Sequence, residues 1–143
     1  MKATRFNVSV ITMLTLLTLP CAYGGVDWAQ DYKSATGRAA KEKKVLMVDL
    51  YADWCGPCRM LDKTTFSNAD VQAELSRDFI AVKVNIESTR ENRDLARDTN
   101  TRAIPHIVFF DSDGKKLSEL VGYYPPDQFL DELRKVAKQA AKK

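Results

Sequence analysis

The sequence predicts an α/β fold in which helices flank both faces of a central mixed β-sheet. Residues 45–51 and 79–86 are nearly continuous apolar runs, which is typical of strands buried on both faces. Residues 107–110 and 116–121 read as two shorter strands. The Asp-Ser-Asp-Gly turn at 111–114 joins them and places glycine where positive φ is expected. Alternating strands and helices followed by a hairpin imply a mixed sheet.

Two helices lie on either side of the first long strand. Residues 27–41 predict an amphipathic helix weakened at Gly37, with apolar side chains near helical spacing at Trp28, Tyr32, Ala35, Ala39 and Ala40. After the strand, a helix is expected from Cys55 to about Lys63. Pro57 is compatible with its first turn, where a backbone N–H has no intrahelical partner.

Three further helices follow in the second half of the chain. Ser67-Asn68 can cap a helix that extends through Arg77, with Val71 and Leu75 facing inward. Residues 91–99 predict a polar helix. The last helix starts at 125–127, and its apolar stripe consists of Phe129, Leu130, Leu133, Val136 and Ala137.

The first 24 residues are expected to be a signal peptide rather than part of the fold. A short basic start with Lys2 and Arg5 precedes an apolar run over residues 8–19, which is too short to cross a membrane. Small residues at Ala22 and Gly24 favour cleavage after Gly24. A lipoprotein anchor on Cys21 and an uncleaved membrane tether are the alternatives. Residues 25–143 are then long enough for one compact domain.

Composition excludes several classes of function. The formal charge of +3 falls to +1 without Lys2 and Arg5, and the lysines are scattered, so nucleic-acid binding is not expected. Only Cys55 and Cys58 remain after cleavage, which is too few for the usual four-ligand zinc site. Arg59 stands where c-type haem attachment requires histidine. No flavin or nicotinamide motif is visible, so we expect no metal and no cofactor.

The segment Trp54-Cys55-Gly56-Pro57-Cys58 places two thiols one helical turn apart where a strand gives way to a helix. Unpaired N–H groups and the positive partial charge at a helix N-terminus both favour thiolate over thiol. We expect Cys55 to lie nearer solvent and Cys58 to be more buried, with a high pKa from desolvation. The local chemistry therefore predicts dithiol–disulfide exchange.

These motifs together resemble the thioredoxin family. The resemblance includes the strand before WCGPC, Ile104-Pro105 before a later strand, and Val121-Gly122 before the final helix, and it covers residues 28–136. It implies a thioredoxin fold over residues 25–143. Residues 50–55 and 65–67 are most similar to the exported C-terminal domain of the transmembrane thiol:disulfide interchange protein.

The resemblance also implies a role for each site residue. Cys55 attacks a substrate disulfide, and Cys58 resolves the mixed disulfide. Asp49 is the buried acid that relays a proton to or from Cys58, and Lys83 lies close to it. Pro105 is a cis-proline opposite the cysteines. The residues expected to contact substrate are Trp54, Gly56, Pro57, Ile104 and Pro105.

Some of these residues have a second interpretation. Asp49 could instead reach water at a strand edge, and Trp54 could be packed in the core. His106, the single histidine, departs from the family, which more often has a small or hydroxyl residue there. It could adjust the cysteine pair electrostatically, or be a strand residue with a satisfied ring; the second is favoured.

The resulting hypothesis is a periplasmic, single-domain dithiol reductant of protein disulfides that works as a monomer. Gly-Pro between the cysteines resembles the reducing end of the family. Without a third cysteine after cleavage, the pair cannot be regenerated internally, so we expect an external donor, namely a membrane electron-transfer protein. The alternatives are a disulfide-forming oxidant and a thioredoxin-fold binding or assembly module.

Overall fold

The structure, a computed structural model, describes residues 25–142, so the expected signal peptide lies outside the described residues. Five strands form one sheet in the order β1-β3-β2-β4-β5. β1, β3 and β2 are mutually parallel, while β4 is antiparallel to β2 and to β5. The sheet is therefore mixed, as predicted. Its strands are β1 (Trp28–Ala29), β2 (Val45–Tyr51), β3 (Phe79–Asn85), β4 (His106–Phe110) and β5 (Lys116–Val121).

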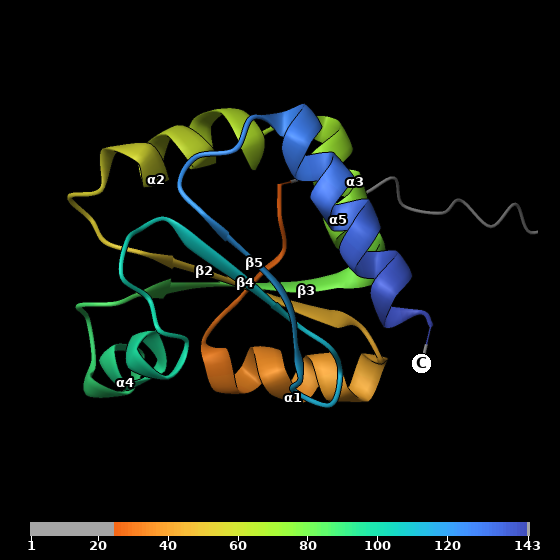
Figure 1. Ribbon diagram of the computed structural model, residues 1–143, viewed down its shortest axis with the longest axis horizontal. Helices are drawn as coiled ribbons and strands as arrows, with labels where there is room; N and C mark the ends of the chain where they lie inside the picture. The colour runs from red at the N-terminus through yellow and green to blue at the C-terminus, as the bar shows by residue number, and fades with distance from the viewer. Residues whose placement is uncertain (1–24, 143) are drawn as a thin grey trace, which may run out of the picture.

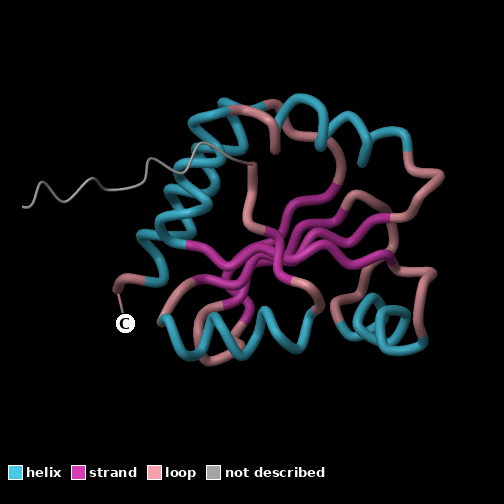
Figure 2. Tube along the Cα trace, turned by 180° about the vertical axis from the view of Figure 1, so that it is seen from behind, coloured by secondary structure: helices cyan, strands magenta, loops and turns pink. Residues whose placement is uncertain are grey.

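Helices cover both faces of the sheet, which confirms the predicted thioredoxin fold (Figures 1 and 2). The α1 face is covered by α1 (Tyr32–Glu42) and α4 (Arg90–Asp98). The opposite α2 face is covered by α2 (Gly56–Met60), the π-helical turn η1 (Leu61–Thr65), α3 (Ala69–Asp78) and α5 (Pro126–Ala140). Because strand side chains alternate, adjacent residues of β2 and β4 contribute to different faces.

The chain before α1 differs from the prediction. Trp28 and Ala29 do not belong to the first helix but form the short edge strand β1, paired with Ala81 and Val82 of β3. Helix α1 begins only after Asp31, whose carboxylate accepts the Ser34 N–H while the Ser34 hydroxyl accepts the Asp31 N–H. This reciprocal cap fixes the helix start. Trp28 still packs against the core, as expected.

The helix that follows β2 is confirmed but is longer and less regular than predicted. Cys55 is its N-cap, Pro57 lies in the first turn, and the chain continues through η1. The Asn68 side chain then accepts the N–H groups of Asp70 and Val71, which confirms the predicted cap of α3. β2 is central and ends just before Cys55, so the cysteines lie at its carboxyl end.

The β4–β5 hairpin also follows the prediction. Gly114 in the connecting turn has φ +84°, and Gly122 after β5 has φ +93°, conformations that favour glycine. On α5, Phe129, Leu133 and Val136 are fully buried against the α2 face. Among residues 25–142, no helix is both long and apolar enough to cross a membrane.

Candidate active site

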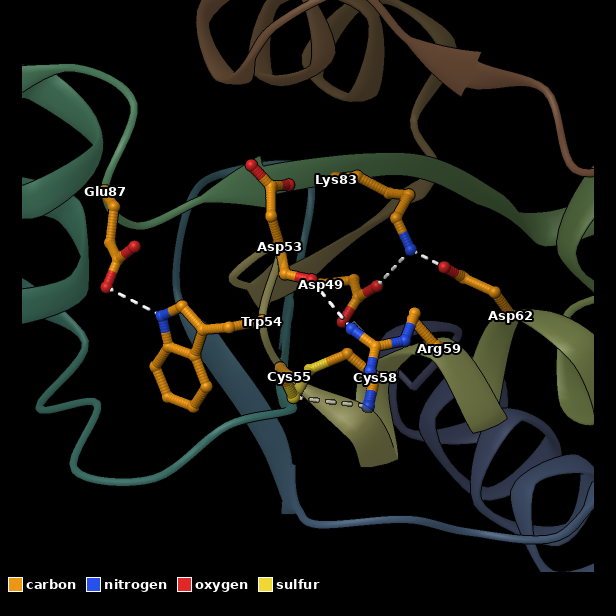
Figure 3. The surroundings of a disulfide bond; sticks show 9 residues. All are labelled: Asp49, Asp53, Trp54, Cys55, Cys58, Arg59, Asp62, Lys83 and Glu87. Carbon is orange, nitrogen blue, oxygen red and sulfur yellow. Dashed lines mark hydrogen bonds and ion pairs between the residues drawn. A yellow bond between two sulfur atoms is a disulfide. The ribbon is translucent and has the colours of Figure 1, made fainter.

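Cys55 and Cys58 form a disulfide at the start of α2 (Figure 3). Cys55 is in an extended conformation as the N-cap, so its side chain turns back over the first helical turn. The Cys58 N–H donates to Cys55 Sγ over 3.2 Å. A helix N-terminal N–H aimed at one sulfur stabilises negative charge on that sulfur. The geometry therefore distinguishes Cys55 from Cys58 as the better thiolate.

The predicted difference in exposure between the two cysteines is wrong for the disulfide form. Cys55 is 2 % exposed and Cys58 is 3 % exposed. In a closed disulfide each sulfur occupies space around the other that solvent would otherwise fill. The two cysteines are distinguished by the hydrogen bond to Cys55 and not by their contact with water.

Asp49 is buried in the middle of the sheet. It is 1 % exposed on β2, between β3 and β4, so the interpretation of a strand-edge residue reaching water is wrong. Its Oδ2 accepts a hydrogen bond from Lys83 Nζ at 2.9 Å, while Oδ1 has no hydrogen-bond partner among residues 25–142. Burial raises the pKa of the Asp49 carboxyl, and Lys83 only partly offsets this effect.

Lys83 lies directly opposite Asp49 on the neighbouring strand β3, as the resemblance implied. Its ammonium group also donates to Asp62 of η1 (Figure 3). Three aromatic rings surround it at 4.9–5.3 Å from Nζ to ring centroid, namely those of Trp28, Tyr51 and Phe66. Although burial opposes its charge, Asp49 and Asp62 raise the pKa of Lys83. The lysine is therefore a shared cation beneath the cysteine helix.

The Ile104–Pro105 peptide bond is cis, which confirms the expectation for this proline. β4 runs antiparallel to β2 with His106 opposite Leu50, so Pro105 lies at the end of the sheet where β2 leads to the cysteines. The Pro105 carbonyl accepts the Gly122 N–H at 2.8 Å. Ile104 and Pro105 are thus fixed between the start of β4 and the end of β5.

Trp54 is 65 % exposed, so the interpretation of a core residue is wrong. Its indole Nε1 donates to Glu87 Oε1 at 3.0 Å, which holds the ring beside the disulfide (Figure 3). Gly56 and Pro57 are also exposed. The large hydrophobic residues exposed in the described part of the chain are Trp54, Met60, Val121 and Tyr123.

His106 has a satisfied, buried ring, as favoured from the sequence. It is 3 % exposed, and its ring nitrogens contact Thr101 Oγ1 at 2.8 Å and Glu119 Oε2 at 3.1 Å. Its neighbour Ile107 belongs to the core of the α2 face, so His106 projects to the α1 face. His106 and Asp49 are therefore on opposite faces of the sheet.

Three acidic residues that contact the predicted site residues were missed: Asp62, Glu87 and Glu119. Only Asp62 carried a sequence signal, because it follows Cys58 by four residues and helical spacing puts both on one side. The other two depend on tertiary contacts. Among residues 25–142, no group of three or more His, Cys, Asp or Glu side chains is placed to hold a metal ion.

A family described as the thioredoxin-like domain matches residues 32–137. The chain belongs to the thioredoxin-like family. The match spans the cysteine pair and every predicted site residue, so the expectation of a thioredoxin-like thiol-disulfide oxidoreductase is confirmed.

Relatives within the family agree with the predicted subfamily. Thiol:disulfide interchange protein DsbD of Tatumella citrea is 38 % identical over 96 residues, which are 65 % of this chain but only 16 % of DsbD. The chain thus spans about a sixth of the length of this curated relative.

Solved structures show the same family fold. A thioredoxin from Thermus thermophilus has a TM-score of 0.74 at 26 % identity, covering 82 % of this chain and 91 % of that one. The oxidised C-terminal domain of DsbD from Neisseria meningitidis has a TM-score of 0.62, also at 26 % identity, covering 72 % and 90 %. The expected likeness to that C-terminal domain is confirmed.

Proposed function

We propose that the chain is an exported dithiol reductant that reduces protein disulfides in the periplasm through Cys55 and Cys58. The observation that carries this proposal is the hydrogen bond from the helix N-terminus to Cys55 Sγ, with the disulfide closed by Cys58 one turn later. A thiol that forms a stabilised thiolate beside a resolving thiol is what disulfide exchange requires.

The reaction proceeds in two exchanges. The Cys55 thiolate attacks one sulfur of a substrate disulfide, which forms a mixed disulfide and releases the other substrate sulfur as a thiolate. The Cys58 thiolate then attacks Cys55 Sγ, closes the Cys55–Cys58 disulfide and releases the second substrate thiolate. The chain loses two electrons and two protons, and the substrate gains two of each.

Asp49 acts on the proton of Cys58 in the second exchange. A carboxylate with a raised pKa and one unpaired oxygen is suited to accept a proton from a nearby thiol. Asp49 faces the same side of the sheet as α2, and Lys83 stabilises its charged form after the transfer. Asp49 is thus the general base for resolution and the acid for the reverse step.

Substrate binds as an extended chain across Trp54, Gly56, Pro57, Ile104 and Pro105. The exposed indole offers apolar contact area, and the segment at Ile104–Pro105 offers backbone groups to an extended peptide. The fixed position of this segment between β4 and β5 supports a preformed binding edge.

Electrons come from outside the chain. The sequence contains three cysteines, and the third, Cys21, lies within the proposed signal peptide. The mature pair therefore needs an external dithiol donor, and we propose a membrane electron-transfer protein. The relation to thiol:disulfide interchange proteins supports this assignment.

A single-turnover assay tests the proposed chemistry. The reduced chain is mixed with oxidised insulin, and free insulin thiols are counted as the Cys55–Cys58 disulfide forms. We expect two insulin thiols for each disulfide closed. In Cys58→Ala a stable mixed disulfide between Cys55 and insulin should accumulate, whereas Cys55→Ser should give none. Equal adduct formation by Cys55→Ser would contradict the assigned order of attack.

Cell fractionation tests export. We expect a soluble periplasmic monomer that begins at Gly25, and the Cys21→Ala variant should be processed in the same way. A lipid-modified chain retained in the membrane through Cys21, or an unprocessed tethered chain, would contradict this part of the proposal.

A further inference from the structure

A surface hollow of about 220 Å³ adjoins the proposed binding edge at Ile104–Pro105. Ala103, which precedes Ile104 directly, is part of its lining. Val121 lies on the other side and is followed by Gly122, whose N–H donates to the Pro105 carbonyl at 2.8 Å. The hollow is therefore continuous with the segment that is proposed to bind substrate. Its main lining residues are Arg102, Ala103 and His106 on one side and Lys116, Glu119 and Val121 of β5 on the other.

Arg102 supplies this hollow with a cation that has no ion-pair partner among residues 25–142. Its Nε donates to Asn100 Oδ1 at 3.2 Å, and this hydrogen bond fixes the direction of the guanidinium plane. The N–H groups of Nη1 and Nη2 have no partner in the described part of the chain. Two parallel N–H groups of a guanidinium match the two oxygens of a carboxylate. Arg102 is thus oriented to bind a carboxylate that comes from outside the chain.

The backbone beneath Arg102 is anchored to the end of α4. Asn100 has φ +56°, a left-handed conformation that asparagine adopts more readily than most residues. Its N–H donates to the Arg97 carbonyl at 2.9 Å, and the Thr101 N–H donates to the Ala96 carbonyl at 2.8 Å. The asparagine side chain that orients the guanidinium is therefore itself held in place. A group that is oriented before binding loses less entropy when the ligand arrives.

The other two charged side chains of the hollow are paired with each other. Lys116 Nζ donates to Glu119 Oε2 at 2.9 Å, and the same oxygen contacts His106 Nε2 at 3.1 Å. Because the charges of Lys116 and Glu119 offset one another, the charge of Arg102 remains uncompensated. The hollow is therefore complementary to a negatively charged group.

The size and lining of the hollow suit a single side chain. Its volume of about 220 Å³ is below the range of about 300–1,000 Å³ that is usual for small-molecule and cofactor pockets. Val121 is 52 % exposed, and with Ala103 it offers apolar surface to the methylene groups of an entering side chain. A carboxylate on a short apolar stem, as in aspartate or glutamate, matches both parts of the lining.

We propose that this hollow is a subsite for an acidic side chain of the protein substrate, held by the Arg102 guanidinium through paired N–H···O bonds. The substrates reduced with the lowest KM are then disulfides that have Asp or Glu close to the attacked cysteine. This substrate class rests on the proposed function, whereas binding of an acidic peptide in the hollow can be measured without any disulfide exchange.

The subsite is tested with disulfide peptides that carry Glu at successive positions on either side of the cysteine, each paired with a Gln peptide. At the best position, the KM of the wild-type chain should be about threefold lower for the Glu peptide, with kcat little changed. Arg102→Gln should lose this preference and keep its KM for the Gln peptide. The matched control is Arg134→Gln, an exposed arginine of α5 near the other end of β2, which should keep the preference. Absence of a Glu preference at every position, or its survival in Arg102→Gln, would overturn the subsite.

Reversal of the charge gives a sharper test. Arg102→Glu should favour a Lys peptide over the Glu peptide at the same position by about threefold, because the direction of the charge attraction is reversed. A variant that still favours Glu would show that the preference arises elsewhere and would overturn the role of Arg102.

Binding without chemistry separates the subsite from the proposed function. The ¹⁵N–¹H signal of Arg102 Nε, assigned by its loss in Arg102→Gln, is followed in the oxidised chain while peptides with Ser in place of Cys are added. We expect a saturable shift with the best Glu peptide and a much smaller one with its Gln counterpart. Equal shifts with both peptides would overturn the subsite. Failure of the wild-type chain to reduce any disulfide peptide would instead contradict the proposed function, and the NMR titration would still decide the subsite.

Discussion

Two buried titratable side chains lie close together on adjacent central strands but face opposite sides of the sheet. Asp49 on β2 faces the cysteine helix, and one of its oxygens has no hydrogen-bond partner among the described residues. His106 on β4 faces the α1 side of the sheet, and both of its ring nitrogens are bonded. The two groups are almost equally buried, at 1 % and 3 % exposure.

The difference shows that burial alone does not decide what a titratable group does. At Asp49, burial raises the pKa of the carboxyl, Lys83 only partly offsets this, and the unpartnered Oδ1 is left able to exchange a proton with a thiol. At His106, both ring nitrogens have hydrogen-bond partners, Thr101 on one side and Glu119 of β5 on the other. The α2 face thus carries the buried group with a free hydrogen-bonding position, and the α1 face carries a buried ring whose hydrogen bonds are complete.

The largest effect is expected when the nucleophile is removed, and it should be confined to the α2 face. In Cys55→Ser we expect reduction of both insulin and a small disulfide to fall at least about a thousandfold, because no thiolate remains to attack. The NMR signal of the His106 ring should be unchanged, since the ring lies on the other face. An altered His106 ring would contradict the separation of the two faces.

The second largest effect is expected when Lys83, the cation of the α2 face, is removed. Lys83→Met leaves Asp49 buried without its ion pair, so we expect a loss of about 2–4 kcal/mol in the free energy of unfolding near pH 8. The loss should be smaller near pH 4, where the Asp49 carboxyl is protonated when folded and needs no cation. Denaturant titrations at both pH values check this, with the exposed Lys63→Met as the matched control. Equal losses at both pH values would contradict the link to Asp49.

Neutralising Asp49 should raise the free energy of unfolding and slow the resolution of the mixed disulfide by Cys58. The raised pKa means that the folded state holds this proton more tightly than the unfolded state, so wild-type stability falls as pH rises above the ordinary aspartate range. Asp49→Asn should therefore gain about 1–3 kcal/mol near pH 8 and little near pH 4. Resolution by Cys58 should slow about tenfold.

Denaturant and single-turnover measurements on Asp49→Asn test both effects, with the exposed Asp53→Asn as control. A destabilised Asp49→Asn protein near pH 8 would show that the carboxylate is better paired than the structure indicates.

The smallest effect is expected at the rim of the site. Trp54→Ala should change the free energy of unfolding by less than about 0.5 kcal/mol, because the ring is 65 % exposed. The KM for insulin should rise about threefold or more through lost contact area. Glu87→Gln weakens the hydrogen bond to the indole without removing the ring, so its KM should change less. A large stability loss in Trp54→Ala would assign the ring to packing.

Sequence patterns predicted the parts of the fold that depend on local periodicity. Three such features are determined by a few adjacent residues each: the apolar run of β2, the Asn68 cap and the glycine in the hairpin turn. The two-residue strand β1 was missed because it is too short to show a period and because Asp31, rather than the apolar pattern, sets the helix start.

The candidate site also contains some features that the local sequence predicts and others that it does not. The cysteine pair is local and was predictable, and the burial of Asp49 followed from its apolar strand. The cis bond at Pro105 was expected only from the family resemblance, since local chemistry favours trans. Contacts that join distant segments, such as Trp54 with Glu87 and His106 with Glu119, have no sequence pattern and required the fold.

The reduction potential of the Cys55–Cys58 pair tests the central claim most directly. Equilibration of the chain with thiol redox buffers would give the fraction of oxidised protein at each buffer potential. A dithiol reductant predicts a value near the thioredoxin end of the family, about −270 mV. A value near the oxidant end, about −120 mV, would reverse the direction of electron flow and make secreted thiols the substrates.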